Sequence, residues 1–505
     1  MNESVGKVYL VGSGPGDPGL ITLRGCQLLE RADVVLYDYL ANPLILARAK
    51  PGAELICLGR HGRDRIMAQA EISSRLVELA RAGRVVVRLK AGDPAVFAHV
   101  AEEIDALEAA GIPYEIVPGI TAALAVGSYA GIPLTHGDSA SAVALVTGQE
   151  REDKQSSSLD YTALAAFPGT LVFYMGITTA ARWTAALILA GKSANTPAAI
   201  VRRCSWPDQE TIACTLGTVA DEILARRLRP PALVVVGAVA ALAPKRGWFA
   251  DRPLFGVRVL VTRPAHQAAE LAEALADLGA QVFLQPAIEI LPPADWSSVD
   301  LAIERLDRYD WLVFSSANGV RSLLDRILEH RDLRALAKIK LAAIGSGTAD
   351  ELARYRLRAD LVPDEYRAEG LIEALKHDAA GKRFLVARAS RGREILAEQL
   401  FAHGGEVEQV VVYTSQDVAE CEPHIGELLA EGHIDWVTVT SSAIARSLAN
   451  MFGAQLASVQ LASISPLTSQ ALRELGYEPA AEAQQATTAD LLAAICRIEK
   501  DRQPK

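Results

Sequence analysis

The sequence has few of the residues that build disulfide frameworks or zinc sites. Its six cysteines are scattered over 505 residues, no two of them have CxxC spacing, and no histidine pattern accompanies them. Disulfide-stapled domains and structural zinc sites both need regularly spaced cysteines. The sequence therefore predicts no disulfide and no metal site, and we expect the cysteines to be small buried side chains.

Long apolar runs and an excess of positive charge are also absent. No segment has the roughly 18 uninterrupted apolar residues of a membrane helix, and residues 1–7 do not form a basic and apolar leader. We therefore expect a cytoplasmic protein without a membrane partner. The net charge of −10 argues against nucleic acid as a partner, and an anionic small substrate would need a local cluster of cations.

The first half of the chain alternates between strand and helix patterns. Apolar runs at 32–38, 54–59 and 84–89 predict strands, and amphipathic patterns at 70–82 and 100–110 predict helices. This alternation is typical of a mostly parallel sheet covered by helices. Because the whole chain is long enough for about three folding units, we expect further domains after it.

A glycine-rich loop follows the first apolar run. Residues 14–19 match the pattern GxGxxG, and Asp38 lies about 20 residues further on, where a dinucleotide-binding fold places a ribose-binding acid. Such a loop works by donating backbone N–H groups to a pyrophosphate, and Pro15 and Pro18 each remove one donor. A nicotinamide-dependent dehydrogenase is therefore kept only as an alternative.

Two more loops follow predicted strands, at residues 90–95 and 117–123. In a parallel sheet the carboxyl ends of the strands share one edge, and ligands bind at that edge. Beyond residue 135 the pattern changes to strands with longer connections, which indicates a second subdomain. Residues 244–255 contain proline, glycine and mixed charge, and indicate a linker.

The second half of the chain is internally repeated. Three segments beginning at Gly256, Asp310 and Leu341 recur in the same order at Gly381, Asp435 and Leu461, about 120 to 125 residues later. Solenoid repeats have periods of roughly 20 to 50 residues, so this spacing predicts a duplicated α/β unit. We expect two similar lobes that face each other across a cleft.

The motifs of the two halves resemble two known families. Those of the first half are residues 11–23, 32–38, 117–122, 131–136 and 171–176, and those of the second are residues 262–263, 315–320, 344–348, 412–414 and 440–441. Through them the first half resembles uroporphyrinogen-III C-methyltransferase and the second resembles uroporphyrinogen-III synthase. The resemblance implies that the synthase half closes hydroxymethylbilane to uroporphyrinogen III, and that the methyltransferase half adds two methyl groups from S-adenosylmethionine (SAM) to give precorrin-2.

The resemblance also implies the architecture. It gives a tetrapyrrole methyltransferase fold with two α/β subdomains, followed by a two-lobed α/β synthase. The predicted boundaries are 1–243 for the methyltransferase (subdomains about 5–135 and 136–243), 244–255 for the linker and 256–500 for the synthase (lobe one about 256–288 and 418–500, lobe two about 289–417). Methyltransferases of this kind are usually dimers, so we expect a homodimer through the first half.

Carried over position by position, the family's SAM contacts fall on nine residues. They are Pro15, Ala91, Gly92, Asp93, Val96, Thr121, Ala122, Met175 and Cys204. Methyl transfer from a sulfonium is an in-line displacement, so the protein mainly positions the donor and the acceptor. Asp93 would lie near the sulfonium, or simply form a turn before Pro94. Met175 has the alternative of a core filler, and Cys204 is expected to contribute only its backbone.

The resemblance names an acid and a base for the methyltransferase. After methylation the carbon framework loses a proton, and Asp38 falls at the family's candidate base, with a simple capping role as the alternative. The family's proposed acid is usually lysine but is Arg60 here, and a guanidinium binds carboxylates but does not release protons. Ala91, Ala95 and His99 also depart from the family pattern, so a degenerate methyltransferase half that only binds ligand is the alternative to a bifunctional enzyme.

Both substrates carry eight carboxylates, so cations and hydroxyls are the expected substrate contacts. Tyr413 matches a tyrosine proposed to help expel the hydroxyl of the bilane, with a plain strand aromatic as the alternative. The predicted substrate-binding residues are Arg63, Arg88, Lys90, Arg263, Ser316, Thr348, Arg388, Thr440 and Thr468. The alternatives are solvated surface charges for the basic residues and helix caps for the threonines.

Overall fold

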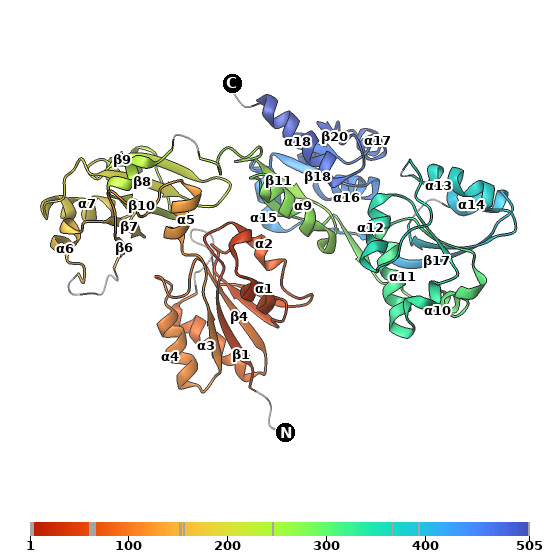
Figure 1. Ribbon diagram of the computed structural model, residues 1–505, viewed down its shortest axis with the longest axis horizontal. Coiled ribbons are helices and arrows are strands. Elements are labelled where there is room, and N and C mark those ends of the chain that lie inside the picture. Colours follow the sequence, from red (N-terminus) through yellow and green to blue (C-terminus); the bar gives the residue numbers. More distant parts are fainter. Residues whose placement is uncertain are drawn as a thin grey trace. The chain divides into compact units, whose positions relative to one another are not determined.

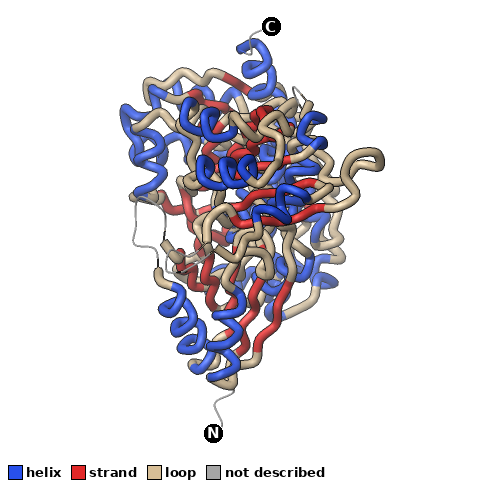
Figure 2. Tube along the Cα trace, turned by 90° about the vertical axis from the view of Figure 1, so that its left-hand side faces the viewer, coloured by secondary structure: helices blue, strands red, loops and turns tan. Residues whose placement is uncertain are grey.

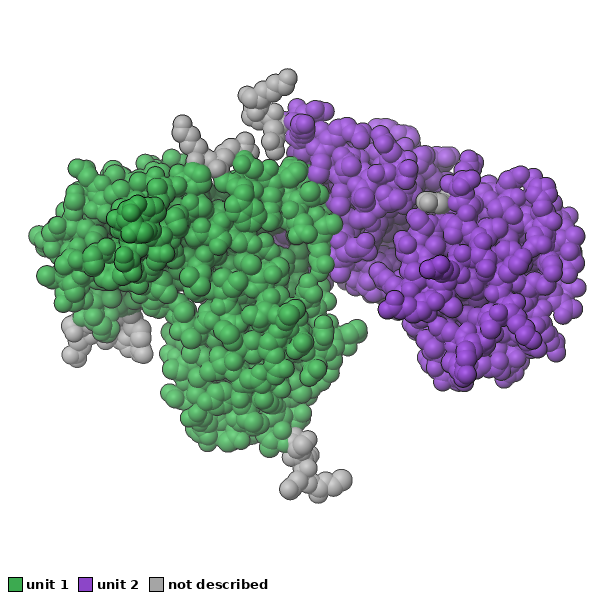
Figure 3. Space-filling view, viewed as in Figure 1, with its two compact units in different colours: residues 1–257, 273–282 green, residues 258–272, 283–505 purple. Residues whose placement is uncertain are grey.

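The computed structural model describes residues 5–59, 67–150, 154, 157–244, 247–365, 367–391 and 394–502. It has two compact units, residues 1–257 with 273–282 and residues 258–272 with 283–505 (Figure 3). Within the described residues the strands form four five-stranded sheets, with helices between the strands (Figures 1 and 2). The α/β fold class expected from the sequence is confirmed. No helix in these ranges is long and apolar enough to cross a membrane.

The first sheet of the first unit has the strand order β3-β2-β4-β1-β5, and all neighbouring strands are parallel. Its strands are β1 (Lys7–Gly12), β2 (Val34–Tyr37), β3 (Glu54–Cys57), β4 (Val85–Lys90) and β5 (Tyr114–Val117). Gly12 of β1 lies opposite Lys90 of β4, and Val11 lies opposite Val117 of the edge strand β5, so the carboxyl ends of these three neighbouring strands are level. The three loops singled out in the sequence therefore begin at one edge of this sheet.

Alternating apolar side chains bury both faces of the first sheet. On one face Val8, Leu10 and Val86 pack with the helices α3 (Gln69–Arg81) and α4 (Val100–Ala109), which Figure 1 shows side by side. On the other face Val11 and Val87 pack with α1 (Leu23–Leu29) and α2 (Pro43–Leu46). Burial of both faces explains why these strands are continuous apolar runs in the sequence.

The second sheet of this unit is mixed, with the order β6-β7-β10-β8-β9. Its strands are β6 (Val143–Thr147), β7 (Thr170–Tyr174), β8 (Pro197–Arg202), β9 (Glu210–Thr215) and β10 (Ala232–Val236). Only the β6–β7 pair is parallel, and the other three pairs are antiparallel. This change of sheet type corresponds to the change of sequence pattern beyond residue 135.

The two sheets of the first unit are joined at the first glycine loop. The indole N–H of Trp206 donates a hydrogen bond to the Pro15 carbonyl (3.2 Å), and the N–H of Asp17 donates to the Ser205 hydroxyl (3.1 Å). Trp206 follows the end of β8 and is almost fully buried. A loop of the first subdomain is therefore fixed by side chains of the second.

Gly16→Ala is expected to weaken this junction. Gly16 has φ of +153°, and an added Cβ would lie 2.2 Å from the Trp206 indole nitrogen. We expect a loss of about 2 to 3 kcal/mol in unfolding free energy, measured by denaturant titration. In a double-mutant cycle the loss should shrink in a Trp206→Ala background, because the clashing ring is gone. An equal loss in both backgrounds would contradict this packing.

The segment predicted as a linker is packed against the first unit. Phe249 and Leu254 are fully buried, and the ring of Phe249 contacts Tyr129 edge-on at 4.7 Å between centroids. The Trp248 indole donates a hydrogen bond to the Ser128 carbonyl (2.8 Å). The described part of this segment therefore carries core side chains that its proline and glycine content does not reveal. The domain boundaries themselves stay predictions.

The second half of the chain contains two sheets in which three strands are arranged alike. One has the order β12-β11-β18-β19-β20 and the other β13-β17-β16-β14-β15. Its strands are β11 (Arg258–Val261), β12 (Gln281–Leu284), β13 (Ile288–Leu291), β14 (Trp311–Phe314), β15 (Lys340–Ala343), β16 (Arg383–Ala389), β17 (Glu406–Asp417), β18 (Trp436–Val439), β19 (Gln460–Ser463) and β20 (Ala481–Glu482). The repeated segments form β11, β18 and β19 in one sheet and β16, β14 and β15 in the other, in matching order, which agrees with the duplication seen in the sequence.

Matching contacts occur in the two copies. The Asp310 carboxylate accepts the backbone N–H of Arg383 (2.9 Å), and the Asp435 carboxylate accepts the backbone N–H of Arg258 (2.8 Å). Both aspartates stand directly before the central strand of their repeat. The repeated Asp-Trp pair in the sequence thus fixes the register of the same two parallel strands in each lobe.

Candidate active sites

The first two glycine-containing loops of the first half are joined through their backbones. The N–H of Gly14 donates to the carbonyl of Gly92 (3.2 Å), and the N–H of Gly92 donates to the carbonyl of Gly14 (2.8 Å). Gly92 has φ of +70°, which favours glycine. The predicted cofactor residues Pro15 and Gly92 are therefore held on neighbouring turns.

Asp93 joins the second loop to the third. One carboxylate oxygen accepts the N–H of Gly119 (2.9 Å), and the other accepts the N–H of Ala95 (2.7 Å). The N–H of Val96 donates to the Asp93 carbonyl (3.2 Å) and closes the turn. Asp93 thus forms the turn that was its alternative role. Each oxygen keeps a second lone pair, so these hydrogen bonds leave a contact with a sulfonium open. That contact stays a prediction.

Three glycines allow these loops to approach one another closely. A Cβ at Gly119 would lie 2.2 Å from the Gly92 carbonyl oxygen, and one at Gly12 would lie 2.6 Å from the Gly119 Cα. At Gly92 an added Cβ would instead point toward Thr121 Cα (3.8 Å) and Ala122 N (4.0 Å). An added Cβ at Gly92 would thus make ordinary van der Waals contact with the third loop, so the backbones of three predicted cofactor residues lie next to one another.

Tyr174 links the third loop to the second subdomain. Its hydroxyl lies 2.6 Å from the Thr121 hydroxyl and accepts the N–H of Ala123 (2.8 Å) at the start of α5 (Ala122–Tyr129). Burial raises the pKa of Tyr174, so the phenol stays protonated. The next residue, Met175, has φ of +51° and is 48% exposed. Met175 is therefore not a core filler, and its backbone has a conformation that is strained for any residue other than glycine.

Cys204 lies just after β8, two residues before Trp206. The thiol is buried, and burial raises its pKa to about 12, so it is neutral and unreactive at physiological pH. This agrees with a contribution from its backbone alone. All nine predicted cofactor positions thus lie on loops that hydrogen bonds connect to one another, or directly beside those loops.

Asp38 follows β2 and is hydrogen-bonded to the second loop. One carboxylate oxygen accepts the guanidinium of Arg88 (2.6 Å), and the other accepts the N–H of Ala91 (3.1 Å). The predicted base and the predicted cofactor loop are therefore in direct contact. Although Ala91 departs from the family pattern, it keeps the backbone donor that this contact needs.

Arg88 and Lys90 are in the interior of the protein and not in an open pocket. They are 3% and 1% exposed, and both pair with Glu103, which is fully buried. The distances are 3.1 Å for Arg88 and 2.7 Å for Lys90. Substrate contact by either side chain stays a prediction, and the structure gives both cations internal partners.

Two departures from the family pattern lie at or near this site. His99 is exposed, has φ of +53° and contacts Glu102 through its Nδ1 (2.9 Å). Ala95 is exposed on the turn that Asp93 closes. The predicted acid Arg60 and the predicted substrate contact Arg63 lie outside the described residues.

In the second half of the chain Tyr413 and Ser316 are in contact. Tyr413 lies in β17 and is buried, and its hydroxyl is 3.0 Å from the Ser316 hydroxyl. Ser316 caps α11 (Ala317–His330) by accepting the N–H of Gly319 (3.0 Å). Burial raises the pKa of Tyr413, so its phenol keeps its proton for donation. Asn318 accepts hydrogen bonds from Gln267 (2.6 Å) and His266 (3.0 Å) of α9 (Ala265–Asp277) beside this pair.

The threonines of the two lobes occupy equivalent places inside helices. Thr348 lies in the first turn of α12 (Ser346–Arg354), and Thr468 lies in the first turn of α17 (Pro466–Glu474). Both side chains are buried, and the N-cap of α17 is Ser465. Thr440 lies between β18 and Ser441, which caps α16 (Ser442–Phe452). The threonines are thus not the caps themselves, and their contact with substrate stays a prediction.

Arg263 and Arg388 are partly buried cations of the second half. Burial lowers the pKa of Arg263. Arg388 donates to Glu394 (3.1 Å) and to Gln409 (3.1 Å). Arg263 follows β11, and Arg388 lies near the end of β16. Their predicted binding of substrate carboxylates stays a prediction.

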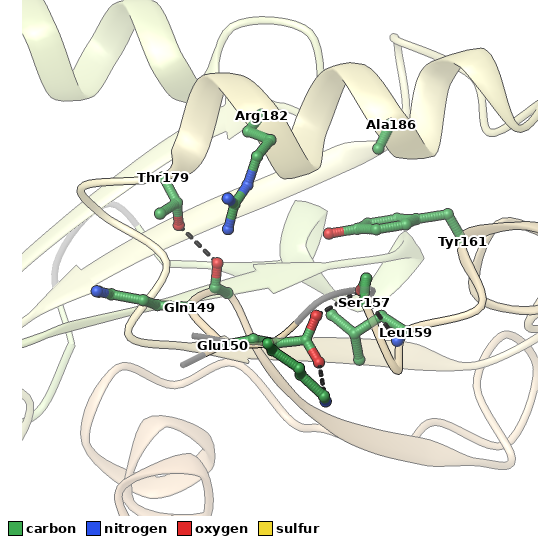
Figure 4. A pocket seen from close by; sticks show the side chains of 10 residues that line it. Gln149, Glu150, Ser157, Leu159, Tyr161, Thr179, Arg182 and Ala186 are labelled. Carbon is green, nitrogen blue, oxygen red and sulfur yellow. Dashed lines mark hydrogen bonds and ion pairs between the residues drawn. The ribbon is translucent and has the colours of Figure 1, made fainter. Parts of the chain in front are cut away.

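A pocket of about 330 Å³ lies elsewhere in the second subdomain (Figure 4). Arg182 and Tyr161 point toward it, and Thr179 donates a hydrogen bond to the Gly148 carbonyl (2.7 Å). None of the predicted site residues lines this pocket. The loops described above, and not the pocket, therefore carry the candidate chemistry.

Three residues that organise the methyltransferase site were missed from the sequence: Tyr174, Trp206 and Glu103. Tyr174 directly precedes Met175 within a family motif, so its place next to the site was visible. Glu103 had a signal too, because Arg88 and Lys90 are two residues apart on a strand and therefore share one face. Two cations on the buried face of a strand require a buried anion. Nothing in the sequence pointed to Trp206 except that it lies two positions after Cys204.

The fold and these residues define a two-part α/β protein with a candidate ligand site at a strand edge of its first half. The family model for tetrapyrrole (corrin/porphyrin) methylases matches residues 7–220, and the model for uroporphyrinogen-III synthase HemD matches residues 269–493. The chain belongs to the family of tetrapyrrole biosynthesis proteins that join a uroporphyrinogen-III C-methyltransferase to a uroporphyrinogen-III synthase.

The chain is similar to named relatives over nearly its whole length or over its first half. The porphyrin biosynthesis protein HemD of Ruminiclostridium josui is 34% identical over 93% of this chain and 94% of its own length. The S-adenosyl-L-methionine-dependent uroporphyrinogen III methyltransferase of Methanosarcina barkeri is 45% identical over 48% of this chain and 95% of its own. A crystal structure of the Thermus thermophilus uroporphyrin-III C-methyltransferase with S-adenosylhomocysteine is 38% identical, covers 48% of this chain and 96% of that chain, and has a TM-score of 0.41.

Proposed function

We propose that this chain catalyses two consecutive steps. The second half closes hydroxymethylbilane to uroporphyrinogen III, and the first half methylates that product twice with SAM to give precorrin-2. The observation that carries the proposal is the contact between Asp38 and Ala91, because it ties a candidate base to the loop expected to hold the methyl donor. Family membership supports both activities.

In the methyltransferase half the chain positions reactants and removes a proton. SAM supplies an electrophilic methyl group when bound, and Gly92, Thr121, Ala122 and Met175 are the residues that would hold it. Arg88 and the N–H of Ala91 fix both oxygens of Asp38. Each oxygen retains a lone pair, so the carboxylate can accept the proton that the methylated carbon framework releases.

In the synthase half the chain folds a flexible bilane and assists the departure of its hydroxyl. The buried phenol of Tyr413 is the candidate proton donor, and the Ser316 hydroxyl orients it. Most of the rate enhancement is expected from holding the two ends of the bilane together. The homodimer expected through the first half is a further part of the proposal.

Tyr413→Phe is expected to slow ring closure by about tenfold, which corresponds to one lost interaction of about 1.4 kcal/mol. The loss stays modest because folding of the bilane does not depend on the phenol. Uroporphyrinogen III formation from hydroxymethylbilane measures it, and methylation of added uroporphyrinogen III by the same variant is the control. An unchanged rate of ring closure would assign Tyr413 to the strand packing alone.

The methyltransferase half is tested with uroporphyrinogen III and SAM. We expect the substrate to be consumed and the product to carry two added methyl groups by mass spectrometry. The competing hypothesis is a half that binds ligand without turning it over. Binding of SAM without any methylated product would support that hypothesis and contradict the proposal.

A further inference from the structure

The most unusual group of charges in the methyltransferase half lies beneath Asp38. Among the described residues, four charged side chains are almost fully buried, and two of them, Arg88 and Lys90, both pair with a third, Glu103. Burying a charge is costly unless it is paired, and replacing a buried ion cluster with apolar side chains is often neutral or stabilising. Stability alone therefore does not explain why this cluster is charged.

The cluster is balanced in charge only when Asp38 is included. Arg88 and Lys90 carry two positive charges, and Glu103 and Asp38 carry two negative charges. Burial and the neighbouring Arg88 lower the pKa of Lys90, while Glu103 counteracts both. Asp38 is the one member that is not deeply buried, with 29% of its side chain exposed. The cluster is thus connected to the candidate cofactor loop through a single, partly exposed carboxylate, that of Asp38.

Hydrogen bonds connect Glu103 of helix α4 to Asp38 through Arg88. Glu103 stands in the first turn of α4, accepts the Nε of Arg88 (3.1 Å), and receives a weaker contact from Gln69 of α3 (3.4 Å). Arg88 then donates Nη1 to the Leu89 carbonyl (3.0 Å) and Nη2 to Asp38 (2.6 Å). With Nε and both terminal nitrogens occupied, the guanidinium plane cannot turn without breaking a hydrogen bond.

We propose that Glu103 is a positioning residue of the methyltransferase site, which fixes Arg88 and through it the orientation of Asp38 beside Ala91. Glu103 is fully buried, so it acts through Arg88 and does not itself touch a ligand. The inference rests on the proposed role of Asp38 as the base. A base held in one orientation needs no rearrangement when the proton is transferred, so the loss of Glu103 should affect turnover more than binding.

The test uses the full chain with Glu103→Gln, which keeps the shape of the side chain and removes its charge. We expect kcat for methylation of uroporphyrinogen III to fall at least about tenfold, while KM for SAM stays within about threefold. Formation of uroporphyrinogen III from hydroxymethylbilane by the same variant reports on concentration and on the integrity of the second half. Glu108→Gln, an exposed position on the same helix, is the matched control and should leave kcat unchanged.

A second variant keeps the proposal testable if Glu103→Gln does not fold. Glu103→Gln with Lys90→Met removes one charge of each sign, and Lys90→Met alone is its reference. We expect the double variant to methylate more slowly than Lys90→Met, because Arg88 has lost the partner that holds it.

The proposal is overturned by a wild-type kcat in Glu103→Gln, by a double variant as fast as Lys90→Met, or by parallel losses of kcat, SAM binding and unfolding midpoint. It is also overturned if neither Glu103 variant folds, because the cluster then serves stability. An inactive wild-type chain would instead contradict the proposed function, which keeps the two failures distinguishable.

Discussion

Asp38→Asn is expected to lower the rate of methyl-group incorporation into uroporphyrinogen III by about 10²- to 10⁴-fold, the usual contribution of a general base. The amide keeps the size of the side chain, although with its single oxygen it accepts a hydrogen bond from only one of the two donors Arg88 and Ala91. It cannot accept a proton at physiological pH. The rate is measured at saturating SAM with the full chain.

Two controls accompany this variant. Asp105→Asn removes an exposed carboxylate from α4 and should leave the methylation rate unchanged. Ring closure of hydroxymethylbilane by Asp38→Asn should equal that of the wild type, since Asp38 belongs to the other half. A methylation rate within about threefold of wild type would assign Asp38 to the capping role that its strand-end position also allows.

Gly119→Ala is expected to abolish measurable SAM binding and to destabilise the first half. The added Cβ would lie 2.2 Å from the Gly92 carbonyl oxygen and 2.8 Å from the Gly12 Cα, so two backbones would have to separate. Overpacking against backbone costs about 3 kcal/mol or more, because neither neighbour is a flexible side chain. The unfolding midpoint of the first half should fall by about 5 to 10 °C.

Gly137→Ala is the matched substitution for this experiment. Gly137 belongs to the same half, is exposed, and has no atom within 4 Å of an added Cβ. Calorimetric titration with SAM and thermal unfolding of both variants compare the two positions. Normal SAM affinity in Gly119→Ala would show that the three loops do not need this close approach.

Much of the fold follows from local patterns in the sequence. Strands of the first sheet are apolar runs because helices cover both of its faces. The duplication in the second half is visible because Asp310 and Asp435 are kept in both copies. Each accepts the equivalent backbone N–H of the neighbouring strand. The loops at the strand ends are visible because glycine and proline mark them directly.

What the sequence does not reveal depends on contacts between distant segments. Trp206 joins the Pro15 loop across 191 positions of the chain, and no local pattern encodes that pairing. Phe249 and Leu254 are core residues within a segment whose composition resembles a linker. Glu103 belongs to an amphipathic helix, where acidic residues in the first turn are ordinary. Arg88 and Lys90 on one strand face require a buried anion, but that Glu103 is this anion becomes evident only once α4 is packed on the sheet.

The most direct test of two active halves in one chain starts from hydroxymethylbilane alone. The purified protein is given this substrate with and without SAM, and the products are identified by absorbance and mass. We expect uroporphyrinogen III without SAM and a product with two added methyl groups when SAM is present. Accumulation of unmethylated uroporphyrinogen III in the presence of SAM, or failure to close the ring, would contradict the account.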